Sequence, residues 1–250
     1  MKNRTGYCYV SISPVRKEPG DQQEMVTQLL FGELIEIVSI EEPWAHIITY
    51  SDRYEGYVDH KHLKFLTEKE VKRWLNGQTI LADRELEIDT PWGIQRICRG
   101  SYVTSDRDEF IIGNSTFQLI RKAEKEFSSI YELSKDYLNT PYLWGGKSPF
   151  GIDCSGFTQI VFRIFGINLP RDAYEQAELG TEVEYNDVVQ GDLAFFSNQK
   201  GKITHVGIIG NDHEIIHASG HVRIDTLTKE GIYREDLDSV THNLYTIKRF

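Results

Sequence analysis

Cys154 is the residue of this sequence best placed to act as a nucleophile. It follows a glycine-rich irregular stretch and stands between Asp153 and Ser155 in the run DCSG. Apolar residues then recur every three or four positions from Phe157 to Phe165, which predicts a helix that begins at Cys154 and buries one face. The free N–H groups and the dipole at a helix N-terminus stabilise a thiolate. The sequence therefore predicts a reactive thiol with a lowered pKa.

Two histidines downstream could supply the base that such a thiol needs. His205 begins the β-like run HVGII, and His217 ends a second β-like run, EIIH. The turn-forming residues 210–212 between them predict a hairpin, which would bring both imidazoles onto one face of a sheet. A cysteine, a base and a third group that orients the base make up an arrangement used in nucleophilic catalysis. Either histidine could instead be a structural residue of its strand.

The elements that would position these residues indicate an α+β domain. A helix is predicted over residues 129–139, with Ser129 and Glu132 as a capping box, and it precedes the helix of Cys154. A short helix follows at 172–177, and strands are then predicted at 192–196, 205–209, 214–218, 222–224 and 244–250. Helices followed by a run of strands are typical of an α+β fold.

The first half of the chain is predicted to be β-structure. About five short strands before residue 66, predicted at 10–12, 25–30, 33–40, 44–49 and 56–58, favour a small barrel. The charged residues 67–77, which could form one or two helical turns, are interpreted as a linker, and a second β-rich segment follows at 78–125. The predicted organisation is thus 1–66 and 78–125 as two small domains, with the chemistry in 126–250.

The second half of the chain resembles the NlpC/P60 cysteine peptidases, papain-like enzymes that cut peptidoglycan peptides. The runs YLWGG, DCSGF, LPRDAYEQ, GDLAFF, THVGIIG and IIHASG occur in the order and spacing of that family. The whole chain is most similar to its γ-D-glutamyl-L-diamino acid endopeptidases, of the dipeptidyl-peptidase VI type. The resemblance implies a multidomain protein in which two small SH3-like β-barrels precede an α+β papain-like catalytic domain.

This resemblance implies roles for the residues that carry the chemistry. Cys154 is expected to be the nucleophile, His205 the general base, and His217 the group that fixes the tautomer of the base. The backbone N–H of Cys154 and the hydroxyl of Tyr142 are expected to bind the oxyanion of a tetrahedral intermediate. Tyr142 could instead be an aromatic residue that packs before a turn.

The resemblance also implies a set of substrate-binding residues. Asp153 and Ser155 are expected to line a pocket for D-glutamate, and Asp172, in the run LPRDA, to bind the free α-amine of the substrate. Asp172 could alternatively cap the short helix that follows it. Glu24 and Tyr54, from the first SH3-like domain, are the expected partners of Asp172 at that amine.

Composition and charge narrow the class of partner. The formal net charge is −10, which argues against binding to nucleic acid or to an anionic wall polymer. No apolar run is long enough to span a membrane, and the first residues lack the apolar core of a secretion signal. Of the three widely spaced cysteines, Cys8 and Cys98 are expected to be buried and inert. We therefore expect a cytoplasmic protein, although a chain that had lost an export signal would read the same way.

The expected function is hydrolysis of the γ-D-glutamyl bond to meso-diaminopimelate or lysine. The substrate would be a small peptidoglycan peptide with a free N-terminal L-alanine, which implies recycling of wall peptides. No metal and no cofactor are expected, and a monomer is favoured. Three alternatives stay open: an exported hydrolase that acts on intact peptidoglycan, a wall-binding protein that uses its SH3-like modules, and acyl transfer in place of hydrolysis.

Overall fold

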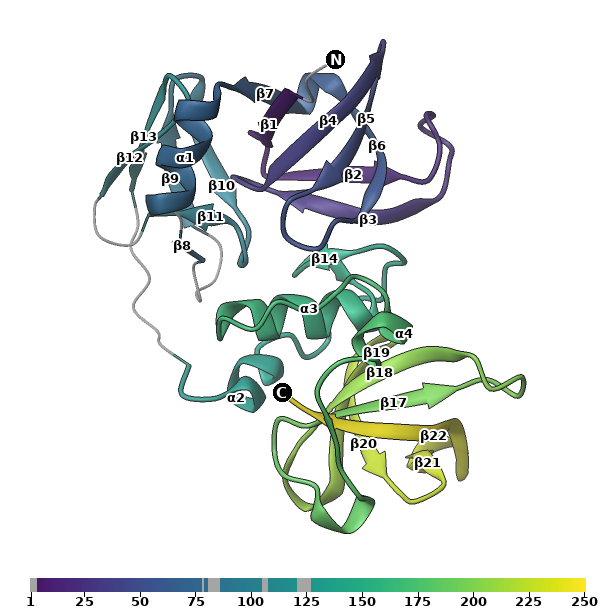
Figure 1. Cartoon of the computed structure of the whole chain (residues 1–250). Coiled ribbons are helices and arrows are strands. Elements are labelled where there is room, and N and C mark those ends of the chain that lie inside the picture. Colours follow the sequence, from purple (N-terminus) through teal and green to yellow (C-terminus); the bar gives the residue numbers. More distant parts are fainter. Residues whose placement is uncertain (1–3, 78, 81–85, 105–107, 121–126) are drawn as a thin grey trace. The chain divides into compact units, whose positions relative to one another are not determined.

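The computed structural model describes residues 4–77, 79–80, 86–104, 108–120 and 127–250. The chain divides into two compact units, Met1–Glu126 and Phe127–Phe250. Each unit has its own sheets and its own buried core, and each is considered by itself (Figure 1). The domain boundary expected between residues 125 and 126 lies outside the described residues, as does residue 78 at the expected start of the second small domain.

The first seven strands of the N-terminal unit form one antiparallel sheet, in the order β3-β2-β6-β5-β4-β1-β7. Their bounds are β1 Arg4–Cys8, β2 Ile12–Arg16, β3 Met25–Leu30, β4 Leu34–Glu41, β5 Trp44–Thr49, β6 Glu55–Asp59 and β7 Leu63–Leu66. Alternate residues point inward, as in β5, where Ala45, Ile47 and Thr49 are buried. The strands predicted at residues 25–30 and 44–49 have these bounds, whereas β1 and β7 were not predicted.

A second, smaller group of strands completes the N-terminal unit. It comprises a four-stranded sheet, β10-β9-β13-β12, and the pair β11-β8. The bounds are β8 Thr79–Ile80, β9 Leu86–Thr90, β10 Gly93–Ile97, β11 Tyr102–Val103, β12 Glu109–Ile112 and β13 Ser115–Leu119. Cys98, which follows β10, and Cys8, at the end of β1, are both buried, as predicted, and neither forms a disulfide bond.

The stretch interpreted as a linker is a packed helix, and that interpretation was wrong. Helix α1 spans Glu68–Gly77 and buries Val71 and Trp74, the latter 1% exposed. The indole N–H of Trp74 donates to the Gly32 carbonyl at 3.0 Å. The core around Trp74 takes residues from both β-rich segments, so the helix joins the two segments instead of merely spacing them.

The main sheet of the C-terminal unit closes on itself. Its order is β16-β22-β17-β18-β19-β20-β21, and β22 also pairs with β21, so six strands form a closed ring. The bounds are β16 Thr181–Glu182, β17 Leu193–Ser197, β18 Ile203–Ile209, β19 Glu214–Ser219, β20 His221–Leu227, β21 Gly231–Arg234 and β22 Ser239–Arg249. The five strands predicted here are present with shifted ends, and β21 was not predicted. A separate short pair, β14 Lys147–Ser148 and β15 Gly151–Ile152, precedes the helix of Cys154.

Three helices precede the strands of the main sheet and gather on one side of it (Figure 1). They are α2 Ile130–Lys135, α3 Cys154–Ile164 and α4 Ala173–Gln176. Helix α3 packs against β18 and β19, and ten of its eleven residues are buried. Gly166 follows it with φ of +80°, the left-handed conformation expected of a glycine at a helix C-terminus. Helix α2 is shorter than predicted, but Ser129 caps it as expected.

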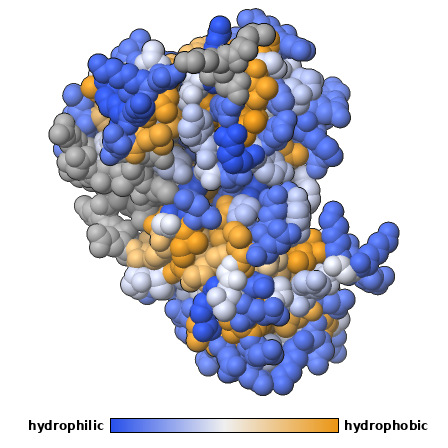
Figure 2. Space-filling model, viewed as in Figure 1, coloured by the Kyte–Doolittle hydropathy of each residue, from blue (hydrophilic) through white to orange (hydrophobic). Residues whose placement is uncertain are grey.

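The visible surface is mostly hydrophilic, with smaller hydrophobic areas on both units (Figure 2). This agrees with the acidic composition of the chain. Among the described residues, none of the helices has the length and apolar character required to cross a membrane.

Candidate active site

Cys154 is the first residue of α3, and the residue before it holds the helix start in place. Asp153 is the N-cap, and its Oδ1 accepts from the Gly156 N–H at 2.7 Å. A Cβ added to Gly156 would lie 2.3 Å from the Gly146 carbonyl oxygen, so only glycine lets the two backbone segments approach so closely. The DCSG run therefore positions the thiol through its cap and its close backbone contact.

The carboxylate of Asp153 is occupied by donors of the protein itself. Besides the Gly156 N–H, it accepts from the Gly145 N–H at 2.8 Å and from both terminal nitrogens of Arg171. The two side chains of the ion pair are 1% and 7% exposed. Arg171 also donates to the Ser155 hydroxyl at 2.8 Å. Asp153 and Ser155 thus belong to a buried polar network at the start of α3, and their predicted contact with D-glutamate stays a prediction.

The electrostatics of the thiol differ from the sequence-based prediction. Burial, followed by the charge of Asp153, raises the pKa of Cys154 to about 12. Hydrogen bonds from the backbone N–H groups of Val206 and Ser155 act in the opposite direction but do not outweigh them. The pKa of the thiol is thus raised and not lowered as predicted, because burial disfavours the charged form. A lone thiolate is therefore disfavoured in this structure.

His205 and His217 are brought together by the predicted hairpin. Strand β18 carries His205, β19 carries His217, and the turn between them contains the short 3-10 helix η3, Asn211–His213. The Nε2 atom of His205 lies 2.7 Å from Nδ1 of His217, and the two rings are nearly perpendicular at 84°. Gly207 pairs with His217, and a Cβ on Gly207 would come within 3.0 Å of the His217 Cβ. The glycine therefore makes room for the second imidazole beside the first.

The thiol lies next to the strand that carries the first histidine. The backbone N–H that approaches the Cys154 sulfur belongs to Val206, the neighbour of His205 in the chain, and α3 packs on β18. Burial, with the charges of His217 and His242, holds the pKa of His205 well below its ordinary value. Both shifts favour the neutral form of each group, so formation of a thiolate here requires a nearby base that takes the proton.

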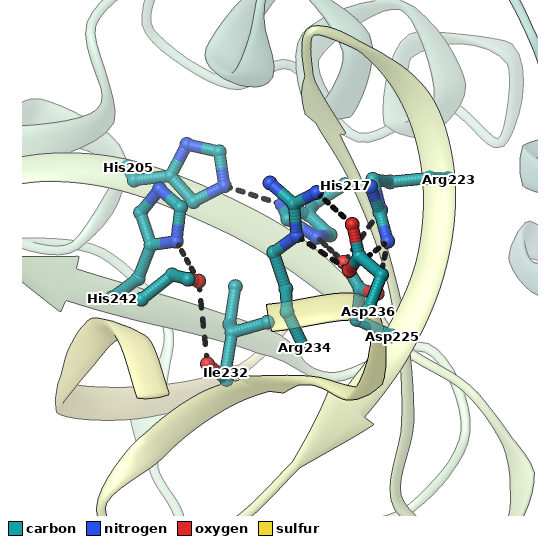
Figure 3. Close-up of polar contacts among 9 residues, drawn as sticks. His205, His217, Arg223, Asp225, Ile232, Arg234, Asp236 and His242 are labelled. Carbon is teal, nitrogen blue, oxygen red and sulfur yellow. Dashed lines mark hydrogen bonds and ion pairs between the residues drawn. The ribbon is translucent and has the colours of Figure 1, made fainter. Parts of the chain in front are cut away.

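Two residues of this region were missed by the sequence analysis. Asp225, on β20, accepts at Oδ2 from Nε2 of His217 at 2.9 Å. His242, on β22, stacks on His205 with ring centroids 4.3 Å apart, and the two rings lie side by side in Figure 3. Asp225 lies on β20, the strand that follows the strand of His217, and this proximity in sequence is only a weak indication that the two side chains meet. The sequence position of His242 gives no indication of its contact with His205. Only the closure of the sheet by β22 brings His242 to this site.

Tyr142 lies in the loop that leads to β14 and keeps its proton. Its backbone N–H donates to the Gly220 carbonyl at 2.9 Å, and it forms a bridge to Ile152. Burial raises the pKa of Tyr142, and the next largest cause is the charge of Cys154, so the phenol lies within electrostatic reach of the thiol. A protonated phenol at this position is able to donate to an oxyanion. Its predicted role is compatible with this placement and stays a prediction.

Asp172 precedes α4 as the cap residue, but its side chain makes no capping hydrogen bond. The alternative role as a helix cap is therefore not supported. Burial and then the charges of Glu175 and Asp172 raise the pKa of Tyr174, so the two acids and this tyrosine are neighbours. Whether Asp172 binds an amine stays a prediction.

Glu24 and Tyr54 belong to the N-terminal unit. Glu24 is exposed just before β3 and pairs with Lys17 at 3.6 Å. Tyr54 is half-buried and its N–H donates to the Thr49 hydroxyl at 2.8 Å. Their predicted contacts with the substrate stay predictions. In the described part of the chain, no group of three or more His, Cys, Asp or Glu residues is arranged to hold a metal ion.

Two family models match the sequence. The model of the NlpC/P60 family matches residues 139–241, which contain Cys154, His205 and His217. The model of the bacterial dipeptidyl-peptidase SH3 domain matches residues 15–63. Both matches confirm the resemblance noted in the sequence, in the C-terminal unit and in the first β-rich segment.

Known proteins share this organisation along most of their length. The chain is 28% identical over 240 residues to a γ-D-glutamyl-L-lysine dipeptidyl-peptidase of Bacillus subtilis, covering 86% of this chain and 79% of the relative. It is 26% identical over 258 residues to dipeptidyl-peptidase 6 of Lysinibacillus sphaericus, covering 88% and 91%. The crystal structure of an NlpC/P60 family protein from Bacillus cereus superposes with a TM-score of 0.79 at 18% identity, covering 98% of this chain and 99% of that one. This similarity shows that the fold is shared.

Proposed function

Since the chain is an NlpC/P60 family peptidase with a bacterial dipeptidyl-peptidase SH3 domain in its N-terminal unit, we propose that it cleaves γ-D-glutamyl bonds in small peptidoglycan peptides. The bond is the one between D-glutamate and the following diamino acid, meso-diaminopimelate or lysine. The preferred substrate carries a free N-terminal L-alanine, and the product is L-Ala-D-Glu. We place this activity in the recycling of wall peptides in the cytoplasm.

The observation that carries the proposal is the hydrogen-bonded histidine pair beside Cys154. A buried thiol with a raised pKa is inert unless a base accepts its proton, and His205 is next to the residue whose N–H approaches the sulfur. The dipeptidyl-peptidase names of the relatives support a small peptide as the substrate. The net charge of −10 favours a small soluble peptide over the anionic wall polymer.

The first half of the proposed reaction forms a thioester. His205 takes the proton of the Cys154 thiol while the sulfur attacks the γ-carbonyl carbon of D-glutamate. The resulting oxyanion accepts hydrogen bonds from the Cys154 N–H, which has no intrahelical partner at the start of α3, and from the Tyr142 hydroxyl. When the tetrahedral intermediate collapses, the C–N bond breaks and His205 returns the proton to the departing amine.

The second half of the reaction releases the dipeptide. Water replaces the diamino acid, His205 takes a proton from it, and the hydroxide attacks the thioester carbonyl. The same two donors hold the second oxyanion. Collapse of this intermediate expels the Cys154 sulfur, which recovers its proton from His205 and leaves L-Ala-D-Glu with a free carboxyl group.

Selection for a free amine rests on carboxylates. Asp172, a neighbour of Tyr174 and Glu175, is the carboxylate that we propose for this amine. A carboxylate attracts an ammonium group and disfavours an amine that is acylated by a glycan, since the acylated form has no charge to offset desolvation.

The test is a direct assay with matched substrates. The full chain is incubated with L-Ala-γ-D-Glu-meso-diaminopimelate, with the L-lysine analogue and with the same peptides acetylated at the N-terminus, and L-Ala-D-Glu is followed by mass spectrometry. We expect cleavage of the free peptides and at least about tenfold lower kcat/KM for the acetylated ones. Cys154→Ala should reduce turnover by about 10⁴-fold or more. Degradation of intact sacculi with no turnover of the free peptides would instead identify a wall hydrolase.

A further inference from the structure

The histidine pair continues into a chain of polar contacts that ends at an ion pair. Nε2 of His205 contacts Nδ1 of His217 at 2.7 Å, and Nε2 of His217 contacts Oδ2 of Asp225 at 2.9 Å. Arg223 holds that carboxylate from the other side, with Nε at 2.7 Å from Oδ2 and a terminal nitrogen donating to Oδ1 at 2.8 Å. Figure 3 shows these side chains projecting from neighbouring strands toward one another.

The ionisation state of each of these hydrogen-bonded groups follows from its surroundings. Although burial of Asp225 acts to raise its pKa, the hydrogen bonds from His217 and Arg223 lower the pKa below its ordinary value, so the group is a carboxylate. Burial is the largest cause of the lowered pKa of His217, opposed by Asp225 and assisted by Arg223 and Arg234. At neutral pH this series of hydrogen-bonded groups thus consists of one carboxylate, that of Asp225, and two neutral imidazoles, those of His205 and His217.

This charge state leaves one arrangement of protons. A carboxylate only accepts hydrogen bonds, so His217 must carry its proton on Nε2 and leave Nδ1 bare. The bare Nδ1 accepts, so His205 must carry its proton on Nε2, and its own Nδ1 is then bare. A bare Nδ1 is what His205 needs in order to accept a proton from the thiol of Cys154.

We propose that Asp225 is a positioning residue that fixes the tautomers of both histidines and thereby directs the basic nitrogen of His205 toward Cys154. This inference rests on the proposed roles of Cys154 and His205. Asp225 thus extends the series Cys154, His205 and His217 by one residue, and its effect reaches the base through His217. When His205 is protonated during turnover, the carboxylate also stabilises the added positive charge through the same contacts.

The other groups around the pair do not supply this directing contact. His242 stacks on His205 and lies 5.8 Å from His217 between ring centroids, with its Nδ1 bonded to the Thr241 hydroxyl at 2.9 Å. Asp236 pairs with Arg234 and lies 3.3 Å from Arg223, and its side chain is 51% exposed. Asp236 therefore offers a matched control carboxylate that shares Arg223 with Asp225.

The first test reads the protons directly in the full chain. Nitrogen-15 NMR of histidine-labelled wild-type protein at neutral pH should show His205 and His217 both protonated at Nε2, with assignment by single His→Gln variants. In Asp225→Asn an amide donor beside His217 should shift both histidines toward the Nδ1-protonated form. Wild-type protein with His205 protonated at Nδ1 would overturn the proposal, whether or not the variant folds.

The second test reads the thiol without any peptide substrate. Alkylation of Cys154 by iodoacetamide, located by mass spectrometry, should be slower in Asp225→Asn and Asp225→Ala than in wild type, and its acid limb should lie at lower pH because the base has lost a stabilising negative charge. Asp236→Asn should alkylate as wild type does. Equal rates and equal pH profiles in all four proteins would overturn the proposal, and this outcome does not depend on the proposed peptide being the substrate.

The third test measures turnover of the cleaved peptide. For Asp225→Asn we expect kcat to fall about 10- to 100-fold, less than the ~10⁴-fold loss seen when the group that contacts the base is changed in a Ser-His-Asp triad. KM should stay within about twofold, because the residue acts on the proton of the base and not on substrate binding. A loss confined to KM would contradict the proposed role.

Discussion

The two sides of the proposed active site both contain a buried aspartate held by an arginine, yet the two pairs differ in what else they touch. On the nucleophile side, Asp153 receives Arg171 and two backbone N–H groups. On the base side, Asp225 receives Arg223 and an imidazole. The first aspartate fixes a backbone turn, while the second contacts an imidazole of the proposed proton-transfer pair. An Asp–Arg ion pair can therefore either support the backbone or influence the protonation of an imidazole, depending on the other groups that the aspartate contacts.

Burial separates the two pairs as well. The Arg171 side chain is 1% exposed, whereas that of Arg223 is 19% exposed and has Asp236 as a second acidic neighbour. A charge left without its partner is costly in proportion to how completely it is cut off from water. The nucleophile side should thus depend on its ion pair for stability, and the base side for chemistry.

The largest expected effect on stability follows from breaking the buried ion pair of Asp153 and Arg171. Asp153→Asn leaves Arg171 charged, buried and incompletely paired, so the free energy of unfolding should fall by about 3–5 kcal/mol. Asp225→Asn should lower it by only about 1–3 kcal/mol, because Arg223 keeps access to solvent and to Asp236. Urea unfolding of the full chain, followed by circular dichroism, measures both.

An exposed ion pair provides the control for that comparison. Glu182→Gln removes the partner of Lys248 at a site where the glutamate side chain is 73% exposed. It should change the free energy of unfolding by no more than about 1 kcal/mol. Equal decreases in the free energy of unfolding for Asp153→Asn and Asp225→Asn would contradict the proposed difference, in which the first pair serves stability and the second protonation.

A smaller effect is expected from the glycines that allow close approach on the two sides. A Cβ on Gly156 would meet a backbone oxygen of Gly146 at 2.3 Å, so Gly156→Ala should destabilise the protein by about 1–3 kcal/mol. Gly207→Ala would meet side-chain atoms, two carbons of Ile215 at 2.8 and 2.9 Å and the His217 Cβ at 3.0 Å, and these longer contacts should have less effect. Thermal unfolding of the two variants under one condition gives their order, and the reverse order would contradict this reading.

The smallest expected effect concerns acid stability on the base side. Burial lowers the pKa of His242 from 6.5 to about 4, so between these values the unfolded chain binds more protons than the folded one. The free energy of unfolding should therefore decrease as pH falls from 6.5 to about 4. His242→Phe keeps an aromatic ring against His205 without a titratable group, and should flatten part of this slope. Urea unfolding at a series of pH values checks it, and an unchanged slope would show that His242 does not contribute.

Local patterns gave much of the site in advance. The start of the helix at Cys154, its glycine cap at Gly166 and the hairpin of His205 and His217 depend on residues close together in the sequence, so spacing and turn propensity were sufficient. The same reasoning failed for residues 67–77, because a charged stretch with Trp74 on one face reads as a linker until a partner surface for that face is known. It also missed β1 and β7, which pair with each other although they lie at opposite ends of the first β-rich segment.

The sequence by itself determined which chemistry was available: a thiol at a helix start, two imidazoles on a hairpin, and an acidic chain with the runs of an NlpC/P60 peptidase. The tertiary structure decided how those groups are charged. Desolvation raises the thiol pKa and lowers those of the imidazoles, and it arises from atoms contributed by the whole unit. Closure of the sheet by β22 places His242 against His205, and the pairing of β19 with β20 places Asp225 against His217. Burial and strand pairing depend on residues that are far apart in the sequence, so no local pattern could have supplied them.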